Sequence, residues 1–541
     1  AILLVAIGFP IALILSWAFD LTPEGVVSDQ GSGVTVQRSG RRMEYVFAGL
    51  LVVAVGTLLY REFSPSEQVV EAVAEQSEQE RLPNSVAVLP FTNLSTDPEE
   101  AFFAAGIHDT VLHELAKIRA LNVIGRTSVL QYADGQTPIA EIAEALNVET
   151  VLEATVQYAD DQVRITAQLI DPDTGAHLWS GNYDRPFKDI FSIQSEIATR
   201  IAMALEAELS PAERASIEQA PTNSPEAWAF YLKALELFPG VEQAGIPRAE
   251  EEAALAFLEQ ATQIDPEFAL AYAHMAKIGW RGIEIRRAQI DQALALDPEL
   301  GFGYLVLGLL HRSEGNATDA QTAFERALQW SPNDPDALTE YAGRKWAIGE
   351  TQNAMTLVER ALVLDPNSWS TYFSVGNFQL WARETAAAAM AFRRVTELSP
   401  TNLAGHLQLG LTEAALGNFS EAAEQFQLVE QLTNLEFSFH NALLAYGYSR
   451  IGRTEDAGRL FGEYQRARTT EEYSPRTRLS LEVWTSLAVG DNQAALDLLQ
   501  ELAEESGIGG NIETFKSNAF DDPILDQPEF VEVRRRLGFR E

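Results

Sequence analysis

The residues with the clearest chemical potential in this sequence are two histidines beside two carboxylates. His108 and His113 lie five positions apart, next to Asp109 and Glu114. Two histidines of one helix that bind the same metal ion are usually spaced as in HExxH, which places both rings on the same face of the helix. A spacing of five separates the rings, so we predict packed or solvated histidines here and no metal site.

Other reactive patterns also fall short of a known site. Asp171 and Asp173 alternate before Gly175, but the segment lacks the glycine spacing and distal glutamate of a calcium loop, so we predict a hairpin turn. Gly106 has no GxxxxGK[ST] or GxGxxG pattern around it to cradle a phosphate. No nucleophile-elbow sequence is present, although a dispersed Ser/His/acid triad stays open. We therefore expect no catalytic residue, no metal and no cofactor.

The composition limits the partners. Asp and Glu number 78 against 39 Lys and Arg in 541 residues, and the formal net charge is −39. Nucleic acid is excluded as a partner, because phosphate binding needs clustered Lys and Arg. We interpret the acidity as a contribution to solubility, with a surface for basic proteins as the alternative. The chain has no Cys, which excludes disulfides, thiolate catalysis and cysteine metal sites.

Two apolar stretches open the sequence. Residues 1–19 are apolar except for Ser16, and residues 43–60 are apolar except for Glu44 and Thr57. Each approaches the roughly 20 residues that a helix needs to span a bilayer. We predict two transmembrane helices. A cleaved signal peptide does not explain the first stretch, because no basic region precedes it. A buried helix is the alternative for the second.

Positive charge indicates the orientation of these helices. Arg38, Arg41 and Arg42 precede the second stretch, whereas Arg61 follows it before a run of glutamates. The positive-inside rule therefore places the intervening loop in the cytoplasm and the chain after about residue 61 in the periplasm. Residues 62–83 are rich in Glu, Gln and Ser, which is typical of a polar linker.

Residues 8–25, GFPIALILSWAFDLTPEG, resemble the membrane segment of a group of bacterial tetratricopeptide proteins. In that group another span usually lies upstream. The sequence begins at Ala1, inside an apolar run and not with Met. The resemblance therefore implies further residues before Ala1.

Apolar periodicity changes between strand and helix spacing in residues 84–209. Phe102, Ile107 and Val111, for example, recur at helical spacing. The predicted order β-α-β-α-β-β-β-α indicates an α/β sandwich. The expected strands are 85–91, 121–125, 150–158, 163–171 and 177–183, and the expected helices are 98–118, 138–146 and 187–209.

These residues resemble the TolB amino-terminal-like domain family, which is also related to the flagellar FlgO domain. The matching segments are VAVLPFTNLSTDPEEAFFAAGIHDTVLHELAKI, LNVIGRTS, IAEIAEALNVETVLEATV, VRITAQLIDPDTGAHLWSGNYDR and DIFSIQSEIATRIA. The resemblance implies a fold and supplies no catalytic residues. In that family the domain often precedes tetratricopeptide repeats, and in other chains it follows cyclase, kinase or winged-helix modules, which this sequence does not contain.

Five prolines mark a repeat in the second half of the sequence. They follow one another at intervals of 32, 34, 34 and 34 residues, a period typical of stacked helical pairs. Within each unit, small residues are expected where the two helices cross and an aromatic ring fills the gap. Glycines are expected in the turn inside each pair. The prolines are Pro266, Pro298, Pro332, Pro366 and Pro400, and the glycines are Gly315, Gly349, Gly417, Gly452 and Gly490.

The repeating offsets resemble the tetratricopeptide repeat (TPR) family. One unit carries Tyr304, Leu307, Gly308, Ala320, Phe324 and Ala327, and another carries Tyr372, Val375, Gly376, Ala388, Phe392 and Val395. The resemblance implies an all-α solenoid. We predict about eight helical pairs in residues 225–505 and a capping segment in residues 506–541.

The first helix of each pair is expected to line a concave groove that binds an extended or helical peptide. Few cations line it, which disfavours a basic clamp for a C-terminal carboxylate. Partial burial of these side chains between neighbouring repeats is the alternative. The candidate groove residues are Arg312, Trp346, Phe373, Asn377, Trp381, Tyr446 and Arg450.

Together these features predict a multidomain, non-enzymatic scaffold: transmembrane helices, an α/β sandwich and a TPR solenoid. It would be embedded in the bacterial inner membrane and bind protein or peptide ligands. Two alternatives stay open. One is a regulatory subunit whose cyclase, kinase or DNA-binding output lies upstream of Ala1, and the other is an enzyme that uses residues 84–209. The sequence leaves homo-oligomerisation undecided.

Overall fold

The computed structural model describes residues 19–22, 25–28, 81–95, 101–238, 248–278, 282–433, 438–467, 475–505 and Pro528. The chain divides into two units, Ala1–Pro65 and Ser66–Glu541. The segment expected to cap the solenoid, residues 506–541, lies outside the described residues apart from Pro528.

In the first unit, the described residues form a small hairpin. β1 (Phe19–Thr22) pairs antiparallel with β2 (Gly25–Ser28). The two expected transmembrane helices, 1–19 and 43–60, lie outside the described residues except for Phe19, which begins β1. Nowhere in the described ranges is a helix both long and apolar enough to cross a bilayer.

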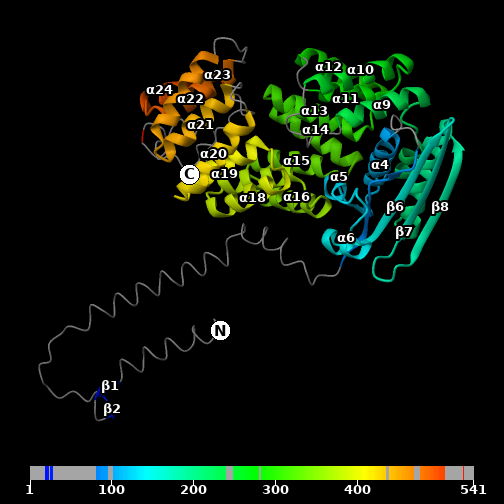
Figure 1. Ribbon diagram of the computed structural model, residues 1–541, viewed down its shortest axis with the longest axis horizontal. Helices are drawn as coiled ribbons and strands as arrows, with labels where there is room; N and C mark the ends of the chain where they lie inside the picture. Colours follow the sequence, from blue (N-terminus) through cyan, green and yellow to red (C-terminus); the bar gives the residue numbers. More distant parts are fainter. Residues whose placement is uncertain are drawn as a thin grey trace, which may run out of the picture. The chain divides into compact units, whose positions relative to one another are not determined.

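The second unit begins with a sheet of six strands. Its order is β5-β3-β6-β7-β8, with β4 beside β6. β3 pairs in parallel with β5 and β6, whereas β6, β7 and β8 are antiparallel neighbours that lie side by side in Figure 1. The strands are β3 (Leu82–Val88), β4 (Thr92–Asn93), β5 (Asn122–Val123), β6 (Val148–Ala159), β7 (Gln162–Ile170) and β8 (His177–Pro186).

Helices cover both faces of this sheet. α4 (Ala101–Ala116) and α7 (Ile190–Ala204) pack on one face, in a core that includes Val86 and Val88. α5 (Arg126–Leu130) and α6 (Ile139–Leu146) pack on the other face, against Ala87 and Leu89. Alternate residues of β3 therefore enter opposite cores, as the two-residue period of a strand requires.

Several elements of this α/β module differ from the expected ones, and β4 and α5 were not expected at all. The first strand begins at Leu82, because Leu82 already pairs with Val148 of β6. The last expected helix, 187–209, is divided into the short turn η3 (Phe187–Asp189) and α7, which ends at Ala204. A further helix, α8 (Pro211–Glu218), follows, and its N-terminus is closed by a capping box between Ser210 and Glu213.

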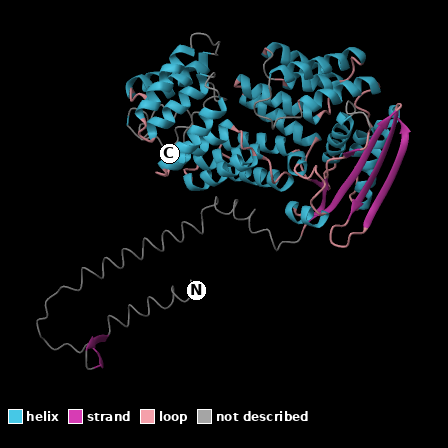
Figure 2. Cartoon of the chain, in the orientation of Figure 1, coloured by secondary structure: helices cyan, strands magenta, loops and turns pink. Residues whose placement is uncertain are grey.

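From residue 225 onward the described chain is helical, and Figure 2 shows no strand there. Sixteen helices form eight successive antiparallel pairs. They are α9 (Pro225–Leu237), α10 (Arg248–Ile264), α11 (Ala269–Lys277), α12 (Ile283–Leu296), α13 (Gly301–Glu314), α14 (Ala317–Trp330), α15 (Pro335–Ala347), α16 (Thr351–Leu364), α17 (Trp369–Trp381), α18 (Thr385–Leu398), α19 (Leu403–Ala415), α20 (Phe419–Thr433), α21 (Ser438–Arg450), α22 (Thr454–Ala467), α23 (Pro475–Ala488) and α24 (Asn492–Glu505).

Glycine makes the close crossing inside three of these pairs. A Cβ atom built on Gly376 would lie 2.6 Å from the ring of Phe392, which is fully buried. A Cβ atom built on Gly308 would likewise overlap the ring of Phe324, and one built on Gly410 would overlap the ring of Phe426. The ring therefore occupies the space that any larger residue would need, which is the steric relation predicted from the repeat.

Left-handed residues close the turns inside the pairs. The five glycines predicted for these turns, from Gly315 to Gly490, all have positive φ values, between 76° and 92°. The turn between α17 and α18 differs, because Arg383 occupies the equivalent position with a φ of 63°. A residue with a side chain thus adopts a conformation that glycine adopts at lower cost.

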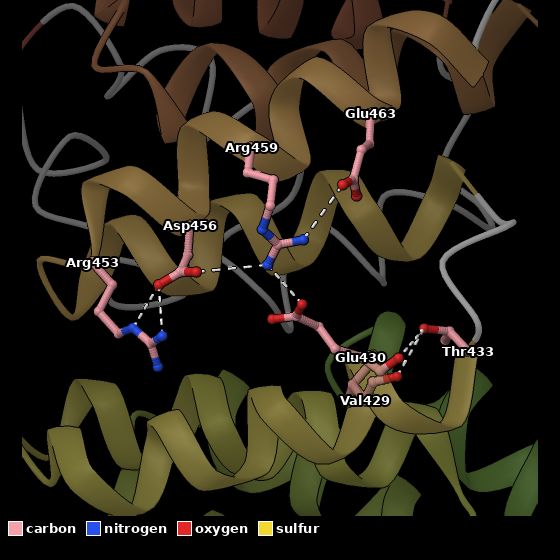
Figure 3. Close-up of polar contacts among 7 residues, drawn as sticks. All are labelled: Val429, Glu430, Thr433, Arg453, Asp456, Arg459 and Glu463. Atoms are coloured by element: carbon pink, nitrogen blue, oxygen red, sulfur yellow. Dashed lines mark hydrogen bonds and ion pairs between the residues drawn. The ribbon is translucent and has the colours of Figure 1, made fainter.

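Ion pairs join the second helices of neighbouring pairs (Figure 3). Arg459 of α22 lies 2.7 Å from Glu430 of α20 and also contacts Asp456 and Glu463 of its own helix. Asp456 in turn pairs with Arg453 at 2.6 Å. Exposed pairs of this kind contribute at most about 1 kcal/mol each, so apolar packing holds the array together.

The α/β module and the first repeats share one apolar core. The cluster that includes Ile107 and Ile197 continues through Trp228 and Leu232 of α9 to Phe268. At its centre, a Cβ atom on Gly106 would overlap the Leu232 side chain, so α4 and α9 approach closely. The solenoid therefore begins directly on the α/β module.

Candidate functional site

Aromatic rings from two successive repeats stack on the first helices α15 and α17. The rings of Trp346 and Phe378 lie 4.8 Å apart and almost parallel, at 5°. Trp381 lies 6.2 Å from Trp346 and 5.6 Å from Phe378. Phe378 is buried, whereas both tryptophans are only partly buried. The predicted groove offsets thus bring Trp346 and Trp381 together.

Phe373, Asn377 and Trp381 follow one another at intervals of four residues on α17, so they lie on one face of that helix. Phe373 is partly buried and packs edge to face on Phe392, with ring centres 5.6 Å apart. The Asn377 Oδ1 and Trp381 Nε1 atoms are buried and have no hydrogen-bond partner among the described residues. We call Trp346, Phe373, Asn377 and Trp381 the aromatic strip.

The arginine predicted at the other end of the groove is engaged. Arg312 of α13 forms a salt bridge with Glu340 of α15, and the two side chains come from successive repeats. This contact neutralises the positive charge on that part of the surface. Arg312 therefore ties two successive repeats together.

The prediction that Tyr446 lines the groove is wrong. Only 1 % of Tyr446 is exposed, because the ring packs 5.0 Å from Trp484 of the next pair. Arg450 donates a hydrogen bond to the Tyr446 hydroxyl at 2.9 Å and lies over its ring. Tyr446 belongs to the core between α21 and α23, and Arg450 covers it.

The turns between repeats form a second site, which the sequence did not predict. The Asn333 amide, before α15, donates to the carbonyls of Ile118 and Leu121 at 2.9 and 2.7 Å. Arg360 of α16 donates to the side-chain oxygens of Asn122 and Asn333, at 2.5 and 3.0 Å. These bonds hold the proline-containing edge of the solenoid on the α/β module.

Asp365 also contacts the α/β module at this junction. Its Oδ1 atom accepts hydrogen bonds from the backbone N–H of Ser128, at 3.0 Å, and from the Ser128 hydroxyl. The Gly125 N–H donates to the Leu364 carbonyl at 2.7 Å. A Cβ atom on Gly125 would lie 2.6 Å from Asp365 Cγ, so this position requires glycine.

A cavity of about 600 Å³ lies at the same junction, and we call it the junction cavity. Its walls come from α4, from the loop before α5, from the segment between α8 and α9, and from α9, α11 and four of the interrepeat turns. Its volume falls within the range of about 300–1,000 Å³ typical of small-molecule sites. The lining includes Asp109, Glu114, Lys117, Arg126, Trp228, Tyr231, Asp265, Glu267, His274, Lys277, Asp297, Glu299, Phe302, Asp334, Asp336 and Asp365.

Three aspartates of this cavity have raised pKa values. Burial, together with repulsion by Asp334, raises the pKa of Asp336 to about 7. Burial also raises the pKa of Asp334 and brings that of Asp365 to about 6, although the hydrogen bonds from Ser128 oppose the second shift. Perturbed groups of this kind gather at functional sites and in structural networks alike.

The two histidines of α4 have separate environments. His108 is buried, and its Nε2 atom lies 2.9 Å from the Val88 carbonyl oxygen. His113 lines the junction cavity, where burial and the nearby Lys117 lower its pKa to about 3. Within the described ranges, no three His, Asp or Glu side chains are grouped so as to hold a metal ion.

The segment that begins at Asp171 is a turn between β7 and β8. The Asp171 side chain accepts hydrogen bonds from the backbone N–H groups of Asp173 and Thr174 at 2.9 and 3.1 Å. Gly175 follows with a φ of 67°. The carboxylate of Asp171 is thus used in closing the turn.

Comparison with known families identifies the helical array. Residues 311–375, from the end of α13 into α17, match the family model described as tetratricopeptide repeat. The array carries TPRs. The matched segment includes Trp346 and Phe373 of the aromatic strip.

One curated relative is named "Putative adenylate cyclase 3" and comes from Rhizobium meliloti (strain 1021). It is 35 % identical over 223 residues, which are 40 % of this chain and 37 % of the relative. The chain therefore spans little more than a third of that protein's length.

Several solved structures match part of this chain at low sequence identity and with TM-scores below 0.5. TTC0263, a thermophilic TPR protein of Thermus thermophilus, is 22 % identical with a TM-score of 0.30, covering 35 % of this chain and 98 % of that chain. YrrB, described as a TPR protein with an unusual peptide-binding site, is 22 % identical with a TM-score of 0.25 and covers 33 % and 92 %. The APC/C hetero-tetramer Cut9-Hcn1 is 15 % identical with a TM-score of 0.39 and covers 64 % and 63 %.

Proposed function

We propose that this protein is a scaffold that binds a peptide segment of a partner protein along the aromatic strip. The observation that carries the proposal is the strip itself. Trp346, Phe373 and Trp381 keep part of their rings at the surface of successive first helices, the elements that line the concave side of a TPR array. Large aromatic rings dominate the energetics of protein interfaces.

The polar atoms of the strip have a secondary part in this proposal. Asn377 Oδ1 and Trp381 Nε1 have no partner among the described residues, but both are buried in the free protein. A peptide backbone, which carries both N–H and C=O groups, could bond them only after these side chains turn outward. The aromatic contacts therefore give the affinity.

Crosslinked capture from membranes tests this function. The full chain and a Phe373→Ala/Trp381→Ala variant would each be crosslinked in the native cell and purified, and their captured proteins compared. Loss of two interface rings should reduce capture of a specific partner at least tenfold, since each such anchor typically contributes about 1–3 kcal/mol.

A matched control removes an exposed ring elsewhere. Phe419, at the start of α20, is 51 % exposed and lies outside the strip. Phe419→Ala should capture the same partner as the wild-type protein. Equal capture by all three proteins would contradict the proposed site.

We also propose that the chain is anchored in the bacterial inner membrane by residues 1–19 and 43–60, with the α/β module and the repeats in the periplasm. The apolar length of both stretches and the arginines before the second support this placement. Alkaline phosphatase fused after residue 84 should be active. An inactive phosphatase together with a fluorescent cytoplasmic reporter at the same position would reverse the topology.

The α/β module is proposed to be a TolB amino-terminal-like domain without a catalytic role of its own. The order of its strands and helices, alternating and then antiparallel, supports this proposal. The purified full chain should release no product from nucleotides or esters. Turnover that disappears when residues 84–209 are deleted would make the protein an enzyme.

A regulatory subunit is the second candidate function. It is supported by the 35 % identity to a relative named as an adenylate cyclase, of which this chain covers 37 %. The coding sequence upstream of Ala1 tests this function. A cyclase, kinase or DNA-binding domain in frame would support it, and a short leader alone would contradict it.

A further inference from the structure

The junction cavity contains two buried polar atoms that the described residues leave unsatisfied. Trp228 is 0 % exposed and His274 is 8 % exposed, and both line the cavity. The Trp228 Nε1 and His274 Nδ1 atoms have no hydrogen-bond partner among the described residues. Buried polar atoms are nearly always paired in folded proteins. Both atoms are covered in the free protein, so an occupant of the cavity pairs with them once the lining side chains shift to admit it.

The geometry around His274 fixes what its free nitrogen can do. Its Nε2 atom lies 3.0 Å from the Tyr231 hydroxyl, and its ring stacks on Phe302 with centres 4.3 Å apart. Burial lowers its pKa well below the usual value, so the ring is neutral. The Nδ1 atom can therefore donate or accept, according to the direction of the Tyr231 hydroxyl. Trp228, in contrast, can only donate and requires an acceptor.

The charge of the cavity favours a cation. Asp265 and Glu267 from one turn, and Asp297 and Glu299 from the next, line it together with Asp336. The charged groups that act on the Asp336 carboxylate are Asp334, Lys277, Asp365 and Glu340. Among these only Lys277 is a cation, so acidic groups dominate the surroundings of Asp336.

Two further cations line the cavity, and each lies beside a carboxylate. Lys117 lies 2.8 Å from Glu114, and Arg126 lies 2.6 Å from Asp109. Carboxyl groups therefore outnumber the cations that line the cavity. A ligand with a net negative charge, such as a phosphate, would be repelled, whereas a ligand with a net positive charge gains attraction in a site that is partly removed from water.

We propose that the junction cavity binds a small organic cation that also carries a hydrogen-bond acceptor, the combination found in a basic amino acid. The ammonium or guanidinium group lies against Asp336 and the acidic turns. The acceptor, a carboxylate in an amino acid, takes the hydrogen bond from Trp228 Nε1. His274 Nδ1 forms the third contact. This site is independent of peptide capture by the aromatic strip.

Calorimetric titration of the purified full chain tests the proposal, with L-arginine and L-lysine as probes. L-glutamate and sodium chloride at equal ionic strength are the controls for anion binding and for screening of charge. Saturable binding of either basic amino acid, without binding of glutamate, is the expected result. No saturable heat from arginine or lysine, or equal heat from glutamate, would overturn the proposal and leave a cavity filled by water only.

Two variants locate the site. Asp336→Asn keeps the side-chain shape and removes its charge, and Trp228→Phe removes the indole donor; each should weaken binding by about tenfold or more. Asp319→Asn is the matched control, because Asp319 lies in the first turn of α14 as Asp336 does in α15, but outside the cavity. If Asp336→Asn binds as tightly as the wild-type protein, the proposed site is wrong. The result for Asp336→Asn is sufficient for this test if Trp228→Phe fails to fold.

Binding should also release protons. The pKa of Asp336 is about 7 in the free protein, and a bound cation stabilises the charged carboxylate. Affinity for arginine should therefore rise by severalfold between about pH 6 and pH 8, and this rise should be absent in Asp336→Asn. An equal pH dependence in wild type and variant would exclude Asp336 as the cation's partner.

Discussion

Ser128 and Asp365, 237 residues apart in sequence, form a buried polar contact between the α/β module and the repeats. The Ser128 hydroxyl donates to Asp365 and in turn accepts a hydrogen bond from the Asn367 N–H at 2.9 Å. One serine therefore satisfies both a carboxylate and a backbone amide of the turn between α16 and α17. The turn is held against the start of α5.

Asp365→Ala should destabilise the protein by about 1–3 kcal/mol, because the buried Ser128 hydroxyl and N–H lose their acceptor. Asp365→Asn should cost much less, since an amide oxygen still accepts and the buried charge is gone. Urea unfolding of the full chain, near neutral pH, measures both changes. Equal losses in the two variants would mean that the charge, and not the acceptor, holds the junction.

The repeat architecture could be predicted from sequence because its determinants are local. Gly376 and Phe392 lie on the two helices of one pair, and the same two residue types recur at the same offset in other repeats. The pattern alone therefore predicts that the glycine packs against the ring. The same pattern placed Trp346 and Trp381 near each other. It failed at Tyr446, because Trp484 of the next pair covers a ring that an isolated repeat would expose.

The junction could not be predicted in this way. Asn333 and Asp365 occupy turns that any helical repeat contains, and nothing near them in sequence indicates Ile118 or Ser128 as partners. One missed element did leave a signal: Ser210 and Glu213 flank Pro211 in a capping-box pattern, which predicts the start of α8.

Gly376→Leu should destabilise the solenoid by about 1–3 kcal/mol, since the first added carbon already overlaps the Phe392 ring. Gly343→Ala is the contrasting change. Gly343 lies inside α15 with open space around it, so alanine should stabilise the helix by about 0.5–1 kcal/mol. Opposite shifts in thermal unfolding are expected, and a loss of stability in both variants would contradict this account of the packing.

Asp336→Asn should stabilise the ligand-free protein in mild alkali but not in acid. The folded pKa of about 7 lies above that of an unfolded aspartate, so the native state binds the proton more tightly. The contribution of Asp336 to stability is therefore highest below about pH 4 and is lost as the pH rises through about 7.

We expect the free energy of unfolding of Asp336→Asn to exceed that of the wild-type protein by about 1–2 kcal/mol at pH 8. This is less than the full pKa shift implies, because water in the cavity screens the charge. Urea unfolding at acidic and alkaline pH measures the difference. Asp319→Asn, also in the first turn of its helix, α14, should show no such dependence on pH. A gain that is the same at both pH values would show that Asp336 titrates normally.

Trp381→Ala should cost less stability than Phe392→Ala. Phe392 is fully buried against Gly376, so its loss leaves a cavity and should cost about 3–5 kcal/mol. Trp381 keeps part of its ring at the surface, and its loss removes less buried area, so we expect at most about 2 kcal/mol. Thermal and urea unfolding of the full chain compare the two variants.

The order of the two stability losses matters for function, because a ring that is needed mainly for folding is not available to a partner. If Trp381→Ala unfolds the array as readily as Phe392→Ala, the aromatic strip is core and the proposed peptide site must lie elsewhere.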